Sequence, residues 1–151
     1  MSNVPKCLDI AYLYPREMST YGDLGNVLSL QRRLEWRGYS HNTIEVHPGA
    51  KPPKHADLIF MGGGQDSGQR VIESSLQDLS AWLHEAVDAG IPGLMICGAY
   101  QLLGHYFETQ DGYRIDGIGV FDAHTVAGRD RRIGNVVVHS SHFGEVIGFE
   151  N

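Results

Sequence analysis

The chain has 151 residues, of which 42% are hydrophobic and 20% are charged, and these proportions are those of a single globular domain. No apolar run is long enough to cross a membrane and residues 1–9 lack the apolar core of a signal peptide, which excludes a transmembrane protein and favours a cytoplasmic one. The net charge of −6 argues against a nucleic-acid-binding protein. Two cysteines, Cys7 and Cys97, are too few for a disulfide framework or an all-cysteine zinc site.

Short apolar segments alternate with amphipathic segments through the first hundred residues, and glycines separate them. This alternation predicts an α/β fold, in which helices cover both faces of an open, mostly parallel sheet. The predicted strands are 8–13, 41–46, 56–61 and 92–96, and the predicted helices are 26–36, 74–89 and 98–106. The side chains expected to face the core are Val27, Leu30, Leu34 and the ring of Trp36 on the first helix, and Leu76, Leu79, Leu83, Ala86 and Val87 on the second.

The pattern changes after Phe107. Residues 115–126 and 135–150 have the character of β segments, with turns at 111–112, at 128 and at 143–144. A β-rich annex is therefore expected on the α/β core. A basic cluster also lies in this part of the chain, and it is either a solvated turn or a site for an anionic partner. Its members are Arg129, Arg131 and Arg132.

Cys97 lies at the junction between a predicted strand and a predicted helix. A residue there is held on a tight turn, and the positive end of the helix dipole favours a thiolate. Gly98 leaves space for a substrate and presents an N–H group directly after the sulfur, which is the arrangement of a nucleophile elbow. The alternative is that Cys97 is a small buried residue without chemistry. Cys7 has no such setting and is expected to be inert.

Three glycines, Gly62 to Gly64, follow the predicted strand 56–61. Glycines at that position let backbone N–H groups approach a ligand closely. A phosphate cradle is one interpretation, but the Lys and Ser/Thr of a P-loop are absent from this segment. An oxyanion hole opposite Cys97 fits acyl transfer better. A tight turn without a ligand is the third possibility.

The segment Cys97-Gly98-Ala99-Tyr100-Gln101 resembles the Cys-Gly-x-x-Gln nucleophile motif of class I glutamine amidotransferases. A closer resemblance, extending over the whole chain, is to the glutaminase subunits (GatD type) of lipid II isoglutaminyl synthases, in the cobyric-acid-synthase-like branch of that family. It implies a flavodoxin-like core. The segments that carry it are 13–15 (LYP), 21–26 (YGDLGN), 33–38 (RLEWRG), 62–64 (GGG), 92–101 and 148–151 (GFEN).

The resemblance assigns roles to individual residues. Cys97 would be the nucleophile, and the N–H groups of Gly63 and Gly98 would stabilise the oxyanion. Gln101 would help to hold the bound glutamine. Arg131 would bind the substrate, because an arginine fork can grip the α-carboxylate of glutamine.

Two assignments stay open. Arg129 and Arg132 are rivals of Arg131 for binding the carboxylate. Asp23 lies near the end of the first strand and therefore near the site, but capping of the next helix is the preferred interpretation of its side chain.

The catalytic base is the missing part of this pattern. Histidine usually serves cysteine hydrolases as the base, and in these amidotransferases it lies far downstream of the cysteine. The chain stops at Asn151, within a motif of the family, so residues 1–151 are expected to form one amidotransferase-like domain that is incomplete at its C-terminus. The isolated chain is then expected to have weak or no glutaminase activity.

No internal histidine is predicted to replace this base. His105 would lie roughly 12 Å along the helix from Cys97 and point away from it. His84 is expected in solvent, and His139 and His142 on the surface of the annex. The other histidines, which show no pairing pattern, are His41, His47, His55 and His124.

The resemblance implies that the chain releases ammonia from L-glutamine through a thioester. The ammonia would pass to a Mur-ligase-like (MurT-type) subunit that amidates D-glutamate of lipid II to D-isoglutamine. No cofactor is expected in this chain, and ATP would bind to the partner, which would also contact lipid II. Two alternatives remain: a glutaminase that serves cobyrinate or another acceptor, and a catalytically silent docking subunit.

Overall fold

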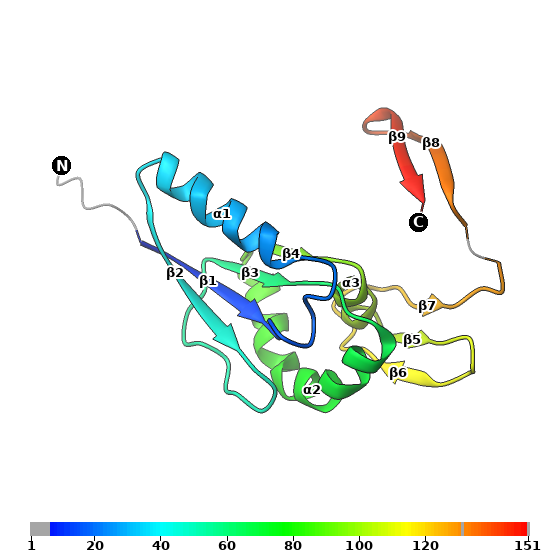
Figure 1. Cartoon of the computed structure of the whole chain (residues 1–151), viewed down its shortest axis with the longest axis horizontal. Helices are drawn as coiled ribbons and strands as arrows, with labels where there is room; N and C mark the ends of the chain where they lie inside the picture. Colours follow the sequence, from blue (N-terminus) through cyan, green and yellow to red (C-terminus); the bar gives the residue numbers. More distant parts are fainter. Residues whose placement is uncertain (1–6, 131, 151) are drawn as a thin grey trace.

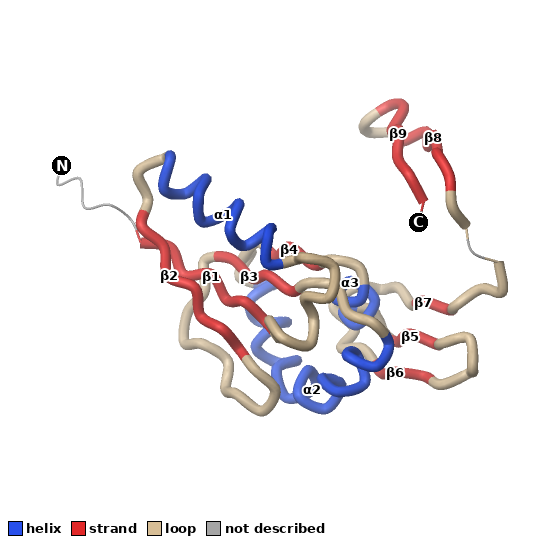
Figure 2. Tube along the Cα trace, viewed as in Figure 1, coloured by secondary structure: helices blue, strands red, loops and turns tan. Residues whose placement is uncertain are grey.

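The structure is a computed structural model, and it describes residues 7–130 and 132–150. Figures 1 and 2 show a central sheet with helices, followed by short strands that extend away from it. The elements are β1 (Cys7–Leu13), α1 (Leu24–Trp36), β2 (Ser40–Val46), β3 (Leu58–Met61), α2 (Asp66–Asp88), β4 (Gly93–Met95), α3 (Gly98–Leu103), β5 (Tyr106–Glu108), β6 (Arg114–Asp116), β7 (Thr125–Val126), β8 (Gly134–Ser140) and β9 (Gly144–Glu150).

The central sheet has the strand order β2-β1-β3-β4, and all of its pairings are parallel. Leu13 pairs with Met61, and Met61 pairs with Met95, so these strands end at one edge of the sheet. The α/β fold with a mostly parallel sheet is thus confirmed. In such sheets the crevice for a ligand lies beyond the carboxyl ends of the strands.

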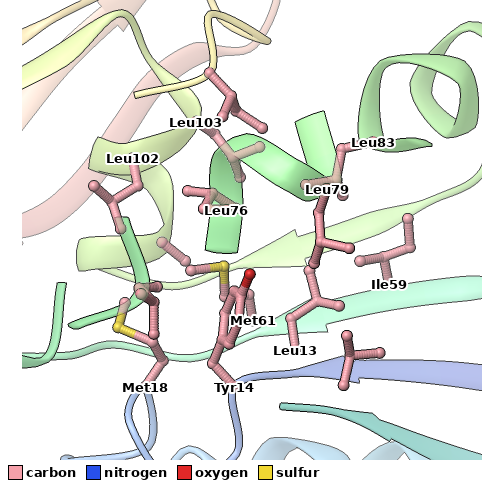
Figure 3. Packing of buried hydrophobic residues seen from close by; sticks show 14 of the residues in the cluster. Leu13, Tyr14, Met18, Ile59, Met61, Leu76, Leu79, Leu83, Leu102 and Leu103 are labelled. Carbon is pink, nitrogen blue, oxygen red and sulfur yellow. The ribbon is translucent and has the colours of Figure 1, made fainter. Parts of the chain in front are cut away.

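Alternate side chains of the central strands point to opposite faces of the sheet. Tyr12 and Phe60 pack with Val27 of α1 on one face, while Leu13 and Met61 pack against α2 on the other. Figure 2 shows α1 and α2 on these two sides. Figure 3 shows the second face, where leucines of α2 and α3 meet the strands. Each fully buried leucine stabilises the fold by about 1.5–3 kcal/mol.

Several predicted boundaries and burials are wrong. Helix α2 begins at Asp66 rather than at residue 74. Its first turn contains Gly68, and glycine suits this position because a Cβ there would come within 2.7 Å of the Glu17 carbonyl oxygen. Trp36, at the last turn of α1, is 74% exposed, and Val87 is 50% exposed because Ala86 continues the buried stripe of α2. Helix α3 ends at Leu103, three residues earlier than expected.

The annex is built from short strands, as predicted. β5 pairs with β6 in antiparallel fashion and with β7 in parallel fashion, and a turn with Gly112 at φ +79° joins β5 to β6. β8 and β9 form an antiparallel hairpin that lies apart from the rest of the chain in Figure 1. Within the described ranges, 7–130 and 132–150, no helix has both the length and the apolar character that crossing a membrane requires.

Candidate active site

Cys97 lies on a sharp turn between β4 and α3, as the sequence predicts, and its thiol is free and exposed. The N–H of Ile96 donates to the Met61 carbonyl oxygen over 3.0 Å, which holds the chain in register with β3 up to the turn. At Cys97 φ is +51° and ψ is −111°. Residues other than glycine rarely adopt this backbone conformation, which costs about 1–3 kcal/mol. The backbone of Cys97 therefore has the strain and position of a nucleophile elbow.

Gly98 begins α3 directly after Cys97 and is buried. A Cβ added at Gly98 would lie 2.7 Å from Nε2 of Gln69 and 3.0 Å from the carbonyl oxygen of Gly64. A larger residue at this position would have to displace the Gln69 side chain and press against the Gly64 carbonyl oxygen. The first N–H groups of a helix have no intrahelical acceptor. The Gly98 N–H is the first of α3 and is adjacent to the thiol-bearing residue.

The glycine loop, Gly62 to Gly64, follows β3 at the same edge of the sheet as Cys97, and all three glycines are buried. A Cβ added at Gly63 would lie 3.1 Å from Cβ of Cys97 and 3.4 Å from Cδ2 of Tyr21. The loop therefore packs tightly against the cysteine, and a side chain at Gly63 would crowd it.

Asp23 has a buried carboxylate that contacts this loop, and the residue is only 4% exposed. Its Oδ2 accepts the Gly63 N–H over 3.0 Å, and the Thr20 N–H donates to the Gly63 carbonyl oxygen over 3.2 Å. The preferred prediction for Asp23 is wrong, since its side chain makes no capping hydrogen bond at α1 and the Leu24 N–H donates to Oγ of Ser19 instead. The segment between β1 and α1, residues 14–23, folds over the glycine loop, and the side chain of Asp23 points inward. We call it the covering segment.

Replacing Asp23 with alanine is expected to lower the free energy of unfolding by about 1–3 kcal/mol, because the buried Gly63 N–H would lose its acceptor. Chemical denaturation measures this change. Thr20→Ala is the matched control, since Thr20 is exposed and uses only its backbone N–H here. Equal stabilities of the two variants would contradict the prediction.

Gln101 lies one helical turn beyond Cys97, and its N–H donates to the Cys97 carbonyl oxygen over 3.2 Å. Its side-chain Oε1 accepts a hydrogen bond from Nε2 of Gln69 over 3.1 Å. Gln69 is a site residue that the sequence analysis missed, because α2 was expected to begin five residues after it. The periodic buried stripe of α2 includes it, and following that stripe back from Leu76 through Ile72 would have found it.

Tyr14 is the other non-glycine residue with a positive φ among the described residues, at +52°. It directly follows β1, is buried, and pairs its hydroxyl with Oγ of Ser75 over 3.1 Å. Burial raises the pKa of the Tyr14 phenol above its ordinary value. The hydrogen bond of this neutral hydroxyl to Ser75 holds the start of the covering segment against α2.

Arg131, the expected carboxylate-binding residue, lies outside the described residues. Its rivals Arg129 and Arg132 are both exposed. Arg129 borders a hollow formed with Thr109 and Gln110 of the annex. The structure thus places Arg129 with the annex and leaves the carboxylate-binding assignment a prediction.

Each of the eight histidines contacts a group other than Cys97. His105 lies beyond the end of α3 and its Nε2 is 3.0 Å from Oδ1 of Asp122. His84, expected in solvent, also has its Nε2 2.8 Å from the Ile118 carbonyl oxygen. The remaining contacts are His41 with Glu35, His47 with Glu45, His55 with Asp57, His124 with Tyr106, His139 with Glu145 and His142 with Ser141.

Comparisons with known proteins identify relatives of this chain. The chain is 34% identical over 145 residues to the lipid II isoglutaminyl synthase (glutamine-hydrolyzing) subunit GatD of Staphylococcus aureus (strain N315), covering 95% of this chain and 60% of that protein. It is 38% identical over 154 residues to the same subunit of Streptococcus pneumoniae (strain ATCC BAA-255 / R6), covering 99% and 58%. The cobyric acid synthase of Methylobacterium nodulans is 30% identical over 100 residues, 63% of this chain and 20% of that protein.

The chain thus spans about 60% of the length of the two GatD relatives that it matches. The family model for the CobB/CobQ-like glutamine amidotransferase domain matches residues 9–151, which include the glycine loop and the Cys97 turn. The chain therefore belongs to the CobB/CobQ-like glutamine amidotransferase family.

Proposed function

We propose that this chain hydrolyses L-glutamine and supplies the ammonia to a Mur-ligase-like, MurT-type subunit, which amidates D-glutamate of lipid II to D-isoglutamine. The observation that carries the proposal is the strained, exposed Cys97 at the strand-to-helix turn, facing the glycine loop. The two GatD relatives, which match nearly the whole chain, support the lipid II assignment. The proposed place of action is the cytoplasm.

In the proposed reaction, the Cys97 thiolate attacks the side-chain carbonyl carbon of glutamine. The carbonyl π electrons move to oxygen, and the oxyanion accepts the Gly98 N–H. Collapse of this intermediate breaks the C–N bond, and the nitrogen takes a proton and leaves as ammonia. The product is a thioester on Cys97, which water hydrolyses to glutamate and free thiol.

Gly63 is the proposed second oxyanion donor. Its N–H donates to the Asp23 carboxylate in the structure, so it must exchange this acceptor for the substrate oxygen during the reaction. Gln101 and Arg131 are proposed to hold glutamine, with Arg129 and Arg132 as the alternatives to Arg131. The side chain of Arg131 suits a carboxylate because a guanidinium binds it with two parallel hydrogen bonds.

The general base is proposed to come from outside these histidines, because none of them hydrogen-bonds to Cys97 among the described residues. A histidine elsewhere in a longer protein, or a group of the ligase subunit, would serve. ATP is proposed to bind the partner, where it would activate the carboxylate that receives ammonia, and this chain needs no cofactor for hydrolysis through a thioester.

The test is to assay the chain, alone and mixed with a MurT-type ligase subunit, for glutamate release and for amidation of lipid II with ATP. The mixture is expected to use glutamine, and the chain alone to show weak or no hydrolysis. Cys97→Ala should abolish amidation from glutamine but not amidation from ammonium chloride. Cys7→Ala is the matched control, because Cys7 is exposed at the opposite end of its strand from the site. Amidation from glutamine that survives Cys97→Ala would contradict the proposal.

The same assay decides between the alternatives. The similarity to cobyric acid synthases favours cobyrinate as a second acceptor, and amidation of cobyrinate in place of lipid II would support it. The positions of the histidines favour a docking subunit without catalysis. A mixture that uses ammonium chloride but never glutamine would support that function.

A further inference from the structure

Gln69 joins the glycine loop to the helix that follows Cys97. It lies near the start of α2, and only 2% of its surface is exposed. Its Nε2 donates to the carbonyl oxygen of Gly64 over 3.2 Å and to Oε1 of Gln101 over 3.1 Å. One amide group thus contacts the backbone of the glycine loop and a side chain of α3, the two segments next to the nucleophile.

The contact with Gly64 fixes how both amides are turned. A carbonyl oxygen can only accept, so the Gln69 atom that faces Gly64 must be the amino group. The Gln101 atom that faces the same amino group must then be its oxygen. The amino group of Gln101, at the other end of its planar amide, is consequently turned away from Gln69.

Gln69 is also kept at an energetic cost. Its Oε1 is buried and has no hydrogen-bond partner among the described residues. A leucine would remove this penalty, but it would leave the carbonyl oxygen of Gly64 and Oε1 of Gln101 without this donor. Moreover, Gln69 packs directly against Gly98, since a Cβ at Gly98 would come within 2.7 Å of Nε2. Packing against Gly98 needs no polar group, so the polarity of Gln69 serves its hydrogen bonds to Gly64 and Gln101.

We propose that Gln69 is a positioning residue that turns the amide of Gln101, so that Gln101 donates its N–H groups to an oxygen of the bound glutamine. This rests on the proposed function, in which glutamine binds beside Cys97. The direction of these hydrogen bonds determines which group of the substrate Gln101 can bind. The amino group of the Gln101 amide can donate to an oxygen of glutamine, but it cannot bind the α-ammonium group, which is itself a donor.

The experiment measures how L-glutamine protects Cys97 from alkylation by iodoacetamide, followed by mass spectrometry. Cys7, also exposed, is the internal reference that glutamine should leave unprotected. The readout is the glutamine concentration that halves the alkylation rate. This readout needs no turnover, and it is independent of the intrinsic reactivity of the thiol in each variant.

Gln69→Glu is expected to raise this concentration about 10- to 100-fold, the loss of one hydrogen bond to a charged group. The carboxylate keeps the shape but only accepts, so Gln101 must turn its amino group toward it and its oxygen toward the substrate. Gln101→Glu, which keeps an acceptor for Gln69 but removes the substrate-facing donor, should cause a similar loss.

Gln77→Glu is the matched control, because Gln77 is on the same helix and donates to the carbonyl oxygens of Asp116 and Gly117 away from the site. It should leave protection unchanged. If Gln69→Glu fails to fold, Gln69→Leu tests the same loss without a buried charge. Protection in the Gln69 variants equal to that of the natural chain would overturn this inference alone. A natural chain whose Cys97 is never protected by glutamine would overturn the proposed function as well.

Discussion

Replacing Cys97 with glycine is expected to abolish glutamine hydrolysis and at the same time to give a more stable chain than Cys97→Ala. Both variants lose the sulfur, and loss of a nucleophile lowers turnover by up to about 10⁶-fold. Alanine retains a Cβ at φ +51°, whereas glycine adopts this conformation without strain. Relief of about 1–3 kcal/mol, less the extra entropy of glycine in the unfolded chain, leaves a gain of about 1–2 kcal/mol.

Chemical denaturation of both variants measures this difference, and glutamate release in the presence of the ligase subunit measures activity. The same alanine-to-glycine change at an exposed helical position is expected to lower the stability instead of raising it. Ala81→Gly in α2 should destabilise the chain by about 1 kcal/mol, because no strain is relieved there. If Cys97→Gly is no more stable than Cys97→Ala, the turn at Cys97 does not hold the strain described here.

Replacing Gly62 with alanine is expected to cause the largest loss of stability among the glycine loop variants. Its Cβ would lie 2.2 Å from the carbonyl oxygen of Met18 and 2.7 Å from Cβ of Asp23. Neither atom is the flexible end of a side chain. The covering segment, residues 14–23, therefore has to move away from the glycine loop. Overpacking of this kind costs typically 1–3 kcal/mol, or roughly 2–12 °C in Tm for a chain of this size.

Activity should fall together with stability in Gly62→Ala, since the neighbouring Gly63 would shift relative to Cys97. A displacement of about 1 Å in a catalytic group lowers the rate by about 10²-fold. Gly25→Ala is the matched control, because a Cβ at Gly25 in α1 meets nothing within 4 Å. It should gain up to about 1 kcal/mol and leave the rate unchanged. An unaltered Tm in Gly62→Ala would contradict the close packing of the two segments.

The elbow at Cys97 was predictable because the strand, the cysteine and the following glycine are adjacent in the sequence. The parallel sheet was predictable as well, since apolar strands such as β3 alternate with amphipathic helices. The positions of Trp36 and Val87 were wrong for a physical reason, namely that helical periodicity gives the direction of a side chain but not where the sheet beneath it ends. Arg131 remains a prediction.

The partners of the site were harder to predict than its nucleophile. Asp23 immediately precedes a helix, where a capping role is the common one. Its actual partner, Gly63, is 40 residues away, and no local pattern indicates that distance. Gln69 was hidden by a polar, glycine-containing first turn that resembles a loop. Its neighbours Gly64, Gln101 and Gly98 come mostly from distant parts of the chain, so its burial is a tertiary effect.

The parallel order of the central strands also determines when the site can form during folding. Asp23 and Gly63 are 40 residues apart and Gln69 and Gln101 are 32 apart, so each contact requires a long loop to close first. The β8–β9 hairpin, in contrast, needs only a three-residue turn and closes within microseconds. This fast local step therefore precedes the contacts that bring Cys97 and the glycine loop together. Cys97 and the glycine loop come together only when β3 and β4 have paired, so we expect chains that have folded only in part to lack this arrangement.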